Sequence, residues 1–215
     1  EMSFASQEDV FAVIEKVLPP IFAKYGVYKT ASEAPFKRIS FLDALDKYGS
    51  DKPDLRFGME LINMVDAVKD SDFKVFNQVI ENGGVVKAIN VKGYANIPRR
   101  ECDALVDFVG IYGAKGLAWM QIQEDGSVKS PIAKFFSEAH MANILATAQA
   151  EAGDLIMFIA DKPAVVAQAL GALRIEMAKR RNLIDPDALA FHLHRGEGHF
   201  YHGTVSTVLG HGNPI

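Results

Sequence analysis

Four charged side chains lie close together in one short loop of the first third of the chain. They are Asp51, Lys52, Asp54 and Arg56, within residues 49–58, a stretch bounded by glycines and interrupted by Pro53. Carboxylates and cations at such spacing can bind a charged ligand through charge-assisted hydrogen bonds. The alternative is that these charges pair with one another around Pro53 and hold the loop in shape. The sequence leaves both interpretations open.

A second group of charged residues is entirely basic. Lys87, Lys92, Arg99 and Arg100 surround the end of a predicted strand and the start of the next helix. Contacts to phosphate groups need such cations, and each contact adds affinity that falls as salt rises. A solvated surface is the other interpretation, because most surface charge faces only water.

Histidines are concentrated at the end of the chain. Five of the six lie there, namely His192, His194, His199, His202 and His211. The first two would share one face of a strand, and imidazole pairs at short spacing suit zinc or nickel. Only Glu197 offers a nearby acidic partner, so we expect adventitious metal affinity rather than an ordered metal site. Cys102, the single cysteine, is interpreted as a packing residue.

Composition excludes several classes of protein. The 215 residues are 49% hydrophobic and 23% charged, which is typical of a packed globular chain. The net charge of −4 excludes a globally basic nucleic-acid clamp. One cysteine permits no disulfide framework, and we expect neither a signal peptide nor a membrane span, which fits a cytoplasmic location. The chain begins abruptly within what reads as a strand, which suggests a piece of a longer protein.

Helical spacing predicts the first elements of the chain. Ser6 is a plausible N-cap with Asp9 as its partner, and the apolar residues that follow predict a helix that ends at Gly26. Pro19 and Pro20 should kink or split this helix, because proline lacks the amide donor and clashes with the preceding turn. Ser40 should begin a second helix over residues 41–48, and a short strand is predicted over residues 59–65.

Regular alternation follows residue 73 and predicts the order β-α-β-β-α-β, closed by a further helix. The strands are expected at 85–91, 117–123, near 128 and at 155–160, and the helices up to 113, at 131–152 and at 164–181. We predict an α+β fold in two layers, with two helices on one face of a small, mostly antiparallel sheet. Basic residues near the last helix end, Arg174 among them, are attributed to the helix dipole.

Several segments of the chain resemble bacterial-type aspartyl-tRNA synthetases, which are class II synthetases. The most specific is Tyr-Gly-Ser-Asp-Lys-Pro-Asp-Leu-Arg-Phe-Gly at residues 48–58. Further matching segments are residues 1–4, 35–40, 72–76, 160–163, 169–174 and 183–186. The middle of the chain is similar to the GAD insertion domain, which is also found in the B subunit of the tRNA-dependent amidotransferase. The resemblance ends near residue 190.

This resemblance implies a domain organisation. Residues 1–66 would be part of the class II catalytic domain, 67–172 the GAD insertion domain and 173–190 the return to the catalytic domain. The histidine-rich tail, 191–215, has no counterpart. The loop at 51–56 would lie beside the active site or the tRNA acceptor end, and the four basic residues at 87–100 would contact tRNA phosphates.

The resemblance also implies an activity, though not one of this chain alone. The intact enzymes attach aspartate to tRNA with ATP and Mg²⁺, and they act as homodimers. The second-motif arginine, the third motif and the aspartate-binding lysine have no match among these residues, so we expect no catalytic residue, no cofactor and no activity in the chain by itself. Two alternatives are a non-catalytic GAD-type module that binds tRNA or protein and, more weakly supported, a metal-binding domain that uses the histidine tail.

Overall fold

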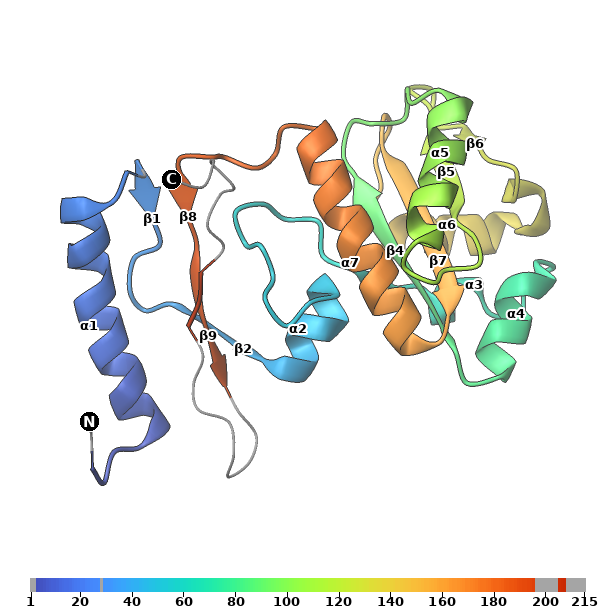
Figure 1. Ribbon diagram of the computed structural model, residues 1–215. Coiled ribbons are helices and arrows are strands. Elements are labelled where there is room, and N and C mark those ends of the chain that lie inside the picture. The colour runs from blue at the N-terminus through green and yellow to red at the C-terminus, as the bar shows by residue number, and fades with distance from the viewer. Residues whose placement is uncertain (1–2, 28, 196–204, 208–215) are drawn as a thin grey trace. The chain divides into compact units, whose positions relative to one another are not determined.

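The computed structural model describes residues 3–27, 29–195 and 205–207 (Figure 1). The chain divides into two compact units. We call the first the flanking unit: Glu1–Leu45, Ser50–Gly58 and Ala178–Ile215. The second, called the inserted unit, comprises Asp46–Gly49 and Met59–Met177. Each unit has its own apolar core, because none of the three clusters of buried apolar residues contains residues of both units.

A five-stranded antiparallel sheet forms the centre of the inserted unit. In spatial order its strands are β3 (Ile62–Asn63), β4 (Val85–Val91), β7 (Leu155–Asp161), β5 (Ala118–Ile122) and β6 (Val128–Lys129). All four strand pairings are antiparallel. The predicted α+β class, the β-α-β-β-α-β order and the antiparallel sheet are therefore confirmed.

Helices pack on both faces of this sheet, not on one. The helices are α3 (Val65–Val68), α4 (Lys74–Glu81), α5 (Arg99–Gly110), the 3₁₀ turn Ala133–Phe135, α6 (Glu138–Thr147) and α7 (Pro163–Arg180). Helices α5 and α7 cover one face, as Figure 1 shows in front of β4 and β7. Helices α3, α4 and α6 pack against the other face.

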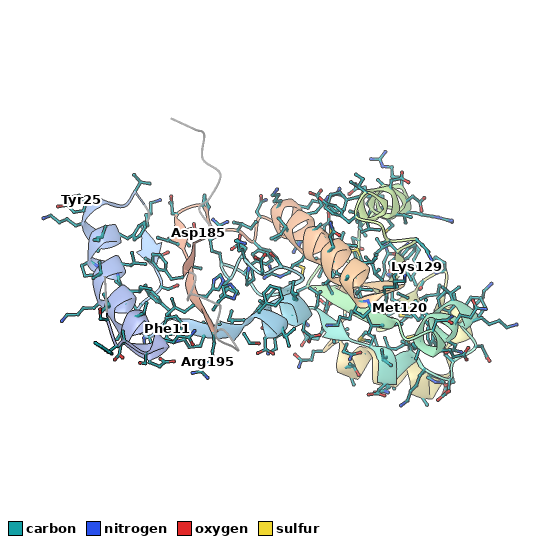
Figure 2. The ribbon with its side chains drawn as sticks, turned by 60° about the horizontal axis from the view of Figure 1, so that its bottom comes forward. Phe11, Tyr25, Met120, Lys129, Asp185 and Arg195 are labelled. Atoms are coloured by element: carbon teal, nitrogen blue, oxygen red, sulfur yellow. The ribbon has the colours of Figure 1, made fainter. Side chains whose placement is uncertain are left out.

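The predicted two-layer arrangement is wrong because the central strands are apolar on both sides. In β7, Leu155, Met157 and Ile159 join the core under α5 and α7, whereas Ile156 and Phe158 join the core under the other helices. Successive side chains of a strand point to opposite faces, so a run of apolar residues requires cover on each face. Met120 of β5 belongs to the second core (Figure 2).

The long helix predicted for residues 131–152 is also wrong in extent. The segment begins with the 3₁₀ turn, and Ser137 then starts α6, which ends at Thr147. The Ser137 side chain accepts a hydrogen bond from the amide of His140, as an N-cap does. A local cap therefore overrode the apolar periodicity of the preceding residues.

The flanking unit packs one helix on two small sheets. Strand β9 (Phe191–Arg195) lies between β2 (Lys37–Ser40), which is parallel to it, and β10 (Val205–Thr207), which is antiparallel. The short strands β1 (Thr30–Ala31) and β8 (Ala188–Leu189) form a parallel pair. Phe11, Phe36, Leu189, Phe191 and Leu193 form the core.

Helix α1 (Gln7–Tyr25) confirms the predicted cap but not a split at the prolines. The Ser6 side chain accepts from the amide of Asp9 and the Asp9 carboxylate accepts from the amide of Ser6, and Gly26 caps the other end. The helix runs on through Pro19 and Pro20 because Leu18 and Phe22, on either side, pack against one core. Figure 2 shows Phe11 facing inward and Tyr25 facing outward.

Helix α2 (Phe41–Tyr48) has its predicted bounds, whereas the strand predicted at residues 59–65 is reduced to β3. None of the described helices is long and apolar enough to cross a membrane.

Candidate functional site

The segment with the most specific resemblance is divided between the two units. Tyr48 and Gly49 belong to the inserted unit, and Ser50–Gly58 belongs to the flanking unit. The motif therefore consists of two residues of the inserted unit and a charged loop of the flanking unit.

Gly49 lies directly against helix α7. Its backbone has a φ of +70°, and a Cβ built there would lie 2.1 Å from the carbonyl oxygen of Ala167 and 2.7 Å from the Cα of Gly171. A Cβ on Gly171 would in turn lie 2.8 Å from the carbonyl oxygen of Gly49. The two backbones touch only because both residues lack a side chain.

Tyr48 strengthens the same contact through its ring and its hydroxyl. The hydroxyl donates to Glu60 Oε1 at 2.7 Å, and the guanidinium of Arg174 lies 5.0 Å from the ring centroid. Arg174 is 1% exposed and donates through Nε to the carbonyl of Met59 at 2.9 Å. The attribution of Arg174 to the helix dipole is therefore wrong: it is a buried residue that stacks on Tyr48.

The four charged residues of the loop at 51–56 form two local pairs. Arg56 donates to Asp54 through Nε at 3.0 Å and through Nη2 at 2.7 Å, and both side chains are 5% exposed. The amide of Arg56 also donates to Asp54. Lys52 pairs with Asp51 at the surface and, through that hydrogen bond above all, lowers the pKa of Asp51. The geometry favours the interpretation in which the loop charges hold its shape, with Asp51 and Lys52 the more accessible to a ligand.

Lys87 and Lys92, from the predicted basic group, also have acidic partners. The ammonium of Lys87 is largely buried, donates to the carbonyl of Asp46 at 2.7 Å and forms an ion pair with the Asp46 carboxylate. The ammonium of Lys92 lies 2.9 Å from Oδ2 of Asp154. Lys87 lies in β4 and Lys92 one residue past its end, so the two are five positions and roughly 16 Å apart and do not form one patch.

Asp154 is the centre of a buried polar network at the end of β4. It is 2% exposed and accepts from the amides of Glu151 at 2.9 Å and Gly93 at 3.0 Å, and from the Asn90 side chain at 3.1 Å. Burial raises the pKa of the Asp154 carboxyl, but these hydrogen bonds together with Lys92 outweigh it, and the pKa is lowered. Sequence reasoning missed this network because its members are separated along the chain.

Arg99 and Arg100 remain exposed in the first turn of α5. Arg99 contacts Asp103 at 4.0 Å, with 81% and 67% of the two side chains exposed. Such an exposed pair contributes little. Among the four predicted basic residues, these two are the most available to a phosphate.

The predicted histidine pair is described, and the rest of the histidine tail is not. His192 and His194 lie on β9 with ring centroids 5.0 Å apart, so the prediction that they share one face of a strand is confirmed. His199, His202 and His211 lie outside the described residues. Within the described ranges, no group of three or more His, Cys, Asp or Glu side chains is placed to hold a metal ion.

An apolar cavity of about 330 Å³ opens between α4, β5 and the end of β7. Phe73, Phe76, Ile132 and Phe158 line it, and the same side chains belong to or pack on the core of that face. No sequence pattern predicted it, because its walls come from segments that are far apart along the chain.

Comparison with known proteins finds a family match within the inserted unit. Residues 76–170 match the GAD domain family. This range contains β4, β5, β6 and β7 and the helices between them. The central part of the inserted unit, built on an antiparallel sheet, is therefore similar to a GAD domain.

The relatives that match most of the chain are ligases. It is 51% identical over 191 residues to an aspartate–tRNA(Asp/Asn) ligase of Heliobacterium modesticaldum, covering 89% of this chain and 31% of that protein. It is 50% identical over 192 residues to the aspartate–tRNA ligase of Listeria monocytogenes, covering 89% and 32%. The chain is therefore homologous to a GAD-containing segment of aspartate–tRNA ligases and spans about a third of their length, which confirms the resemblance.

Proposed function

We propose that this chain is part of an aspartate–tRNA ligase. The whole enzyme would join aspartate to tRNA with ATP and Mg²⁺ in the cytoplasm, and it would act as a homodimer. The observation that carries the proposal is identity of about half over 89% of the chain to such ligases. Residues 1–66 and 173–190 would belong to the catalytic domain, and 67–172 to the GAD insertion.

The chain by itself would not catalyse the reaction. Stabilising the charge that develops on the α-phosphate requires arginines and a metal ion. The motifs that supply them in the resembling family have no match among these 215 residues. The chain would therefore act only as part of the larger enzyme.

Pyrophosphate exchange tests this proposal. The chain alone should show no aspartate-dependent exchange of pyrophosphate into ATP, whereas the Listeria ligase assayed in parallel should. Replacing the homologous segment of that ligase with this chain should retain exchange and tRNA charging. Exchange by the chain alone, or a folded chimaera without charging, would contradict the proposal.

For the charged loop, we propose a position beside the substrate or the tRNA acceptor end. The Asp54–Arg56 pair would hold the backbone, and the more exposed Asp51 and Lys52 would face the ligand. In the chimaera, Lys52→Ala should then raise the KM for tRNA or ATP without changing the midpoint of unfolding.

For tRNA contact, we propose Arg99 and Arg100 as the leading residues, with Lys87 and Lys92 secondary because both already have acidic partners. Replacing both arginines with alanine should weaken tRNA binding and reduce the salt slope by about 2, one for each lost phosphate contact. Filter binding over a range of salt concentrations measures both quantities.

Lys74→Ala is a matched control, because it removes an exposed charge from α4 on the opposite face of the sheet. Equal losses from both variants would show a general charge effect. If the chain binds tRNA but the chimaera is inactive, the alternative of a non-catalytic GAD-type binding module gains support.

A further inference from the structure

One buried and one half-buried imidazole of the flanking unit have buried ring nitrogens without a hydrogen-bond partner among the described residues. His192 is 0% exposed, and neither its Nδ1 nor its Nε2 has a partner among the described residues; the same holds for Nε2 of His194. Buried polar atoms are normally paired, and an unpaired one calls for an explanation such as a bound water or ion. Three such atoms on adjacent rings are the observation from which a shared ligand is inferred.

The geometry of the two rings suits one metal ion. They lie on the same side of β9 with centroids 5.0 Å apart and planes inclined by 74°. A tetrahedral zinc ion binds imidazole nitrogen at about 2.0–2.1 Å, which places two coordinated ring centroids roughly 5 Å apart.

Burial keeps one ring in the neutral form that binds metals. Burial, followed by His194 and Lys37, lowers the pKa of His192 to about 4, so this imidazole is neutral at physiological pH. Metal binding requires the neutral form. Asp51 interacts electrostatically with His194 and supplies an acidic charge, whereas Lys37 pairs in register with His192 and opposes a cation.

We propose that His192 and His194 form a two-imidazole site for a borderline divalent cation such as zinc, with water in the remaining positions. Both histidines follow residue 190, near which the resemblance of the sequence to the synthetases ends, and the inference does not rest on the proposed function. The described residues supply no third protein ligand, and the affinity is accordingly lower than that of a three- or four-residue site.

Zinc titration of the full chain after chelator treatment tests the site. A chromophoric competitor should report one Zn²⁺ per chain, and Co²⁺ substitution should give the visible spectrum of a nitrogen- and oxygen-ligated ion. The variants His192→Phe and His194→Gln should each lower the affinity at least about tenfold, as the loss of groups that only orient a ligand already does.

Two controls make the result decisive. A variant with glutamine at His199, His202 and His211 should keep the bound ion; if it loses the ion while His192→Phe keeps it, the proposal is overturned. Should His192→Phe fail to fold, His194→Gln takes its place, because His194 is the more exposed of the two. Retention of the ion by His194→Gln, with loss of the ion from the triple variant, then overturns the proposal. Absence of zinc binding at neutral pH in the folded full chain also overturns the proposal.

Discussion

Arg56 illustrates, at the scale of single residues, how a charge takes a partner only two residues away. Its guanidinium is engaged in a bidentate contact with Asp54, with both side chains 5% exposed. Removing one member of a buried ion pair takes the ionic partner away from the other charge, which costs far more than the net contribution of the pair itself.

Arg56→Ala should therefore lower the free energy of unfolding by about 3–5 kcal/mol. Urea denaturation of the full chain measures it. Lys52→Ala, which breaks the exposed pair of the same loop, is the matched control and should change stability by about 1 kcal/mol or less. Equal effects of the two substitutions would show that burial of the Asp54–Arg56 pair has no consequence.

His192 should make the free energy of unfolding of the flanking unit fall as the solution becomes acidic. Its pKa in the folded chain is about 4, below the ordinary 6.5, so the folded state excludes a proton that the unfolded state binds. The stability that the neutral, buried ring contributes is fully present above pH 6.5 and is lost as the pH falls from 6.5 to 4. The loss in the free energy of unfolding is up to about 3 kcal/mol. Denaturation at several pH values, in chelator, should show this slope in the natural chain and not in His192→Phe.

At the scale of elements, the contact between Gly49 and Gly171 fixes the end of α2 against α7. Gly49 belongs to the segment with the most specific resemblance, 48–58, and Gly171 to a further matching segment, 169–174. Their sequences gave no sign that they meet. The structure explains their composition: backbone touches backbone, and Tyr48 and Arg174 stack beside the contact.

Either glycine should resist substitution. Gly49→Ala adds a Cβ 2.1 Å from the carbonyl oxygen of Ala167 and strains a positive φ, and Gly171→Ala adds one 2.8 Å from the Gly49 carbonyl oxygen. Since overpacking costs about 1–3 kcal/mol and φ strain a further ~1 kcal/mol, Gly49→Ala should be the more destabilising. Thermal unfolding followed by circular dichroism measures both.

Gly58 and Gly110 provide the controls, because an added Cβ meets nothing within 4 Å at either position and neither has a positive φ. Gly58→Ala serves for the loop glycine and Gly110→Ala for the helical one. Both should leave the unfolding midpoint unchanged or slightly raised. A midpoint for Gly49→Ala that matches Gly58→Ala would show that the contact with α7 is not close in solution.

At the scale of the whole molecule, the two units have separate cores. The inserted unit buries apolar residues on both faces of its sheet, and the flanking unit depends on one small cluster around Phe11 and Phe191. A polypeptide of residues 46–177 should therefore fold alone, with a cooperative transition at the midpoint of the more stable unit of the full chain. Calorimetry of both proteins measures this. A non-cooperative transition for 46–177 would show that its core depends on the flanking unit.

The sequence alone predicted what depends on neighbouring residues. Ser6 and Asp9 form a capping box three residues apart, and apolar runs placed β4 and β7 within a residue of their observed bounds. The ligase resemblance likewise rests on contiguous motifs and required no tertiary contact. Local errors occurred where two local signals competed, as in α6, where the Ser137 cap prevailed over apolar spacing.

The tertiary structure decided which partner each charge takes. Lys87 pairs with Asp46, 41 residues away, and the two histidines acquire their buried surroundings only when β9 pairs with β2. The charged loop at 51–56 lies between these cases. Its four residues were named from the sequence, but only the fold shows that Asp54 and Arg56 are buried together while Asp51 and Lys52 face water. Burial depends on contacts between distant segments, and it determines whether a charge is available to a ligand.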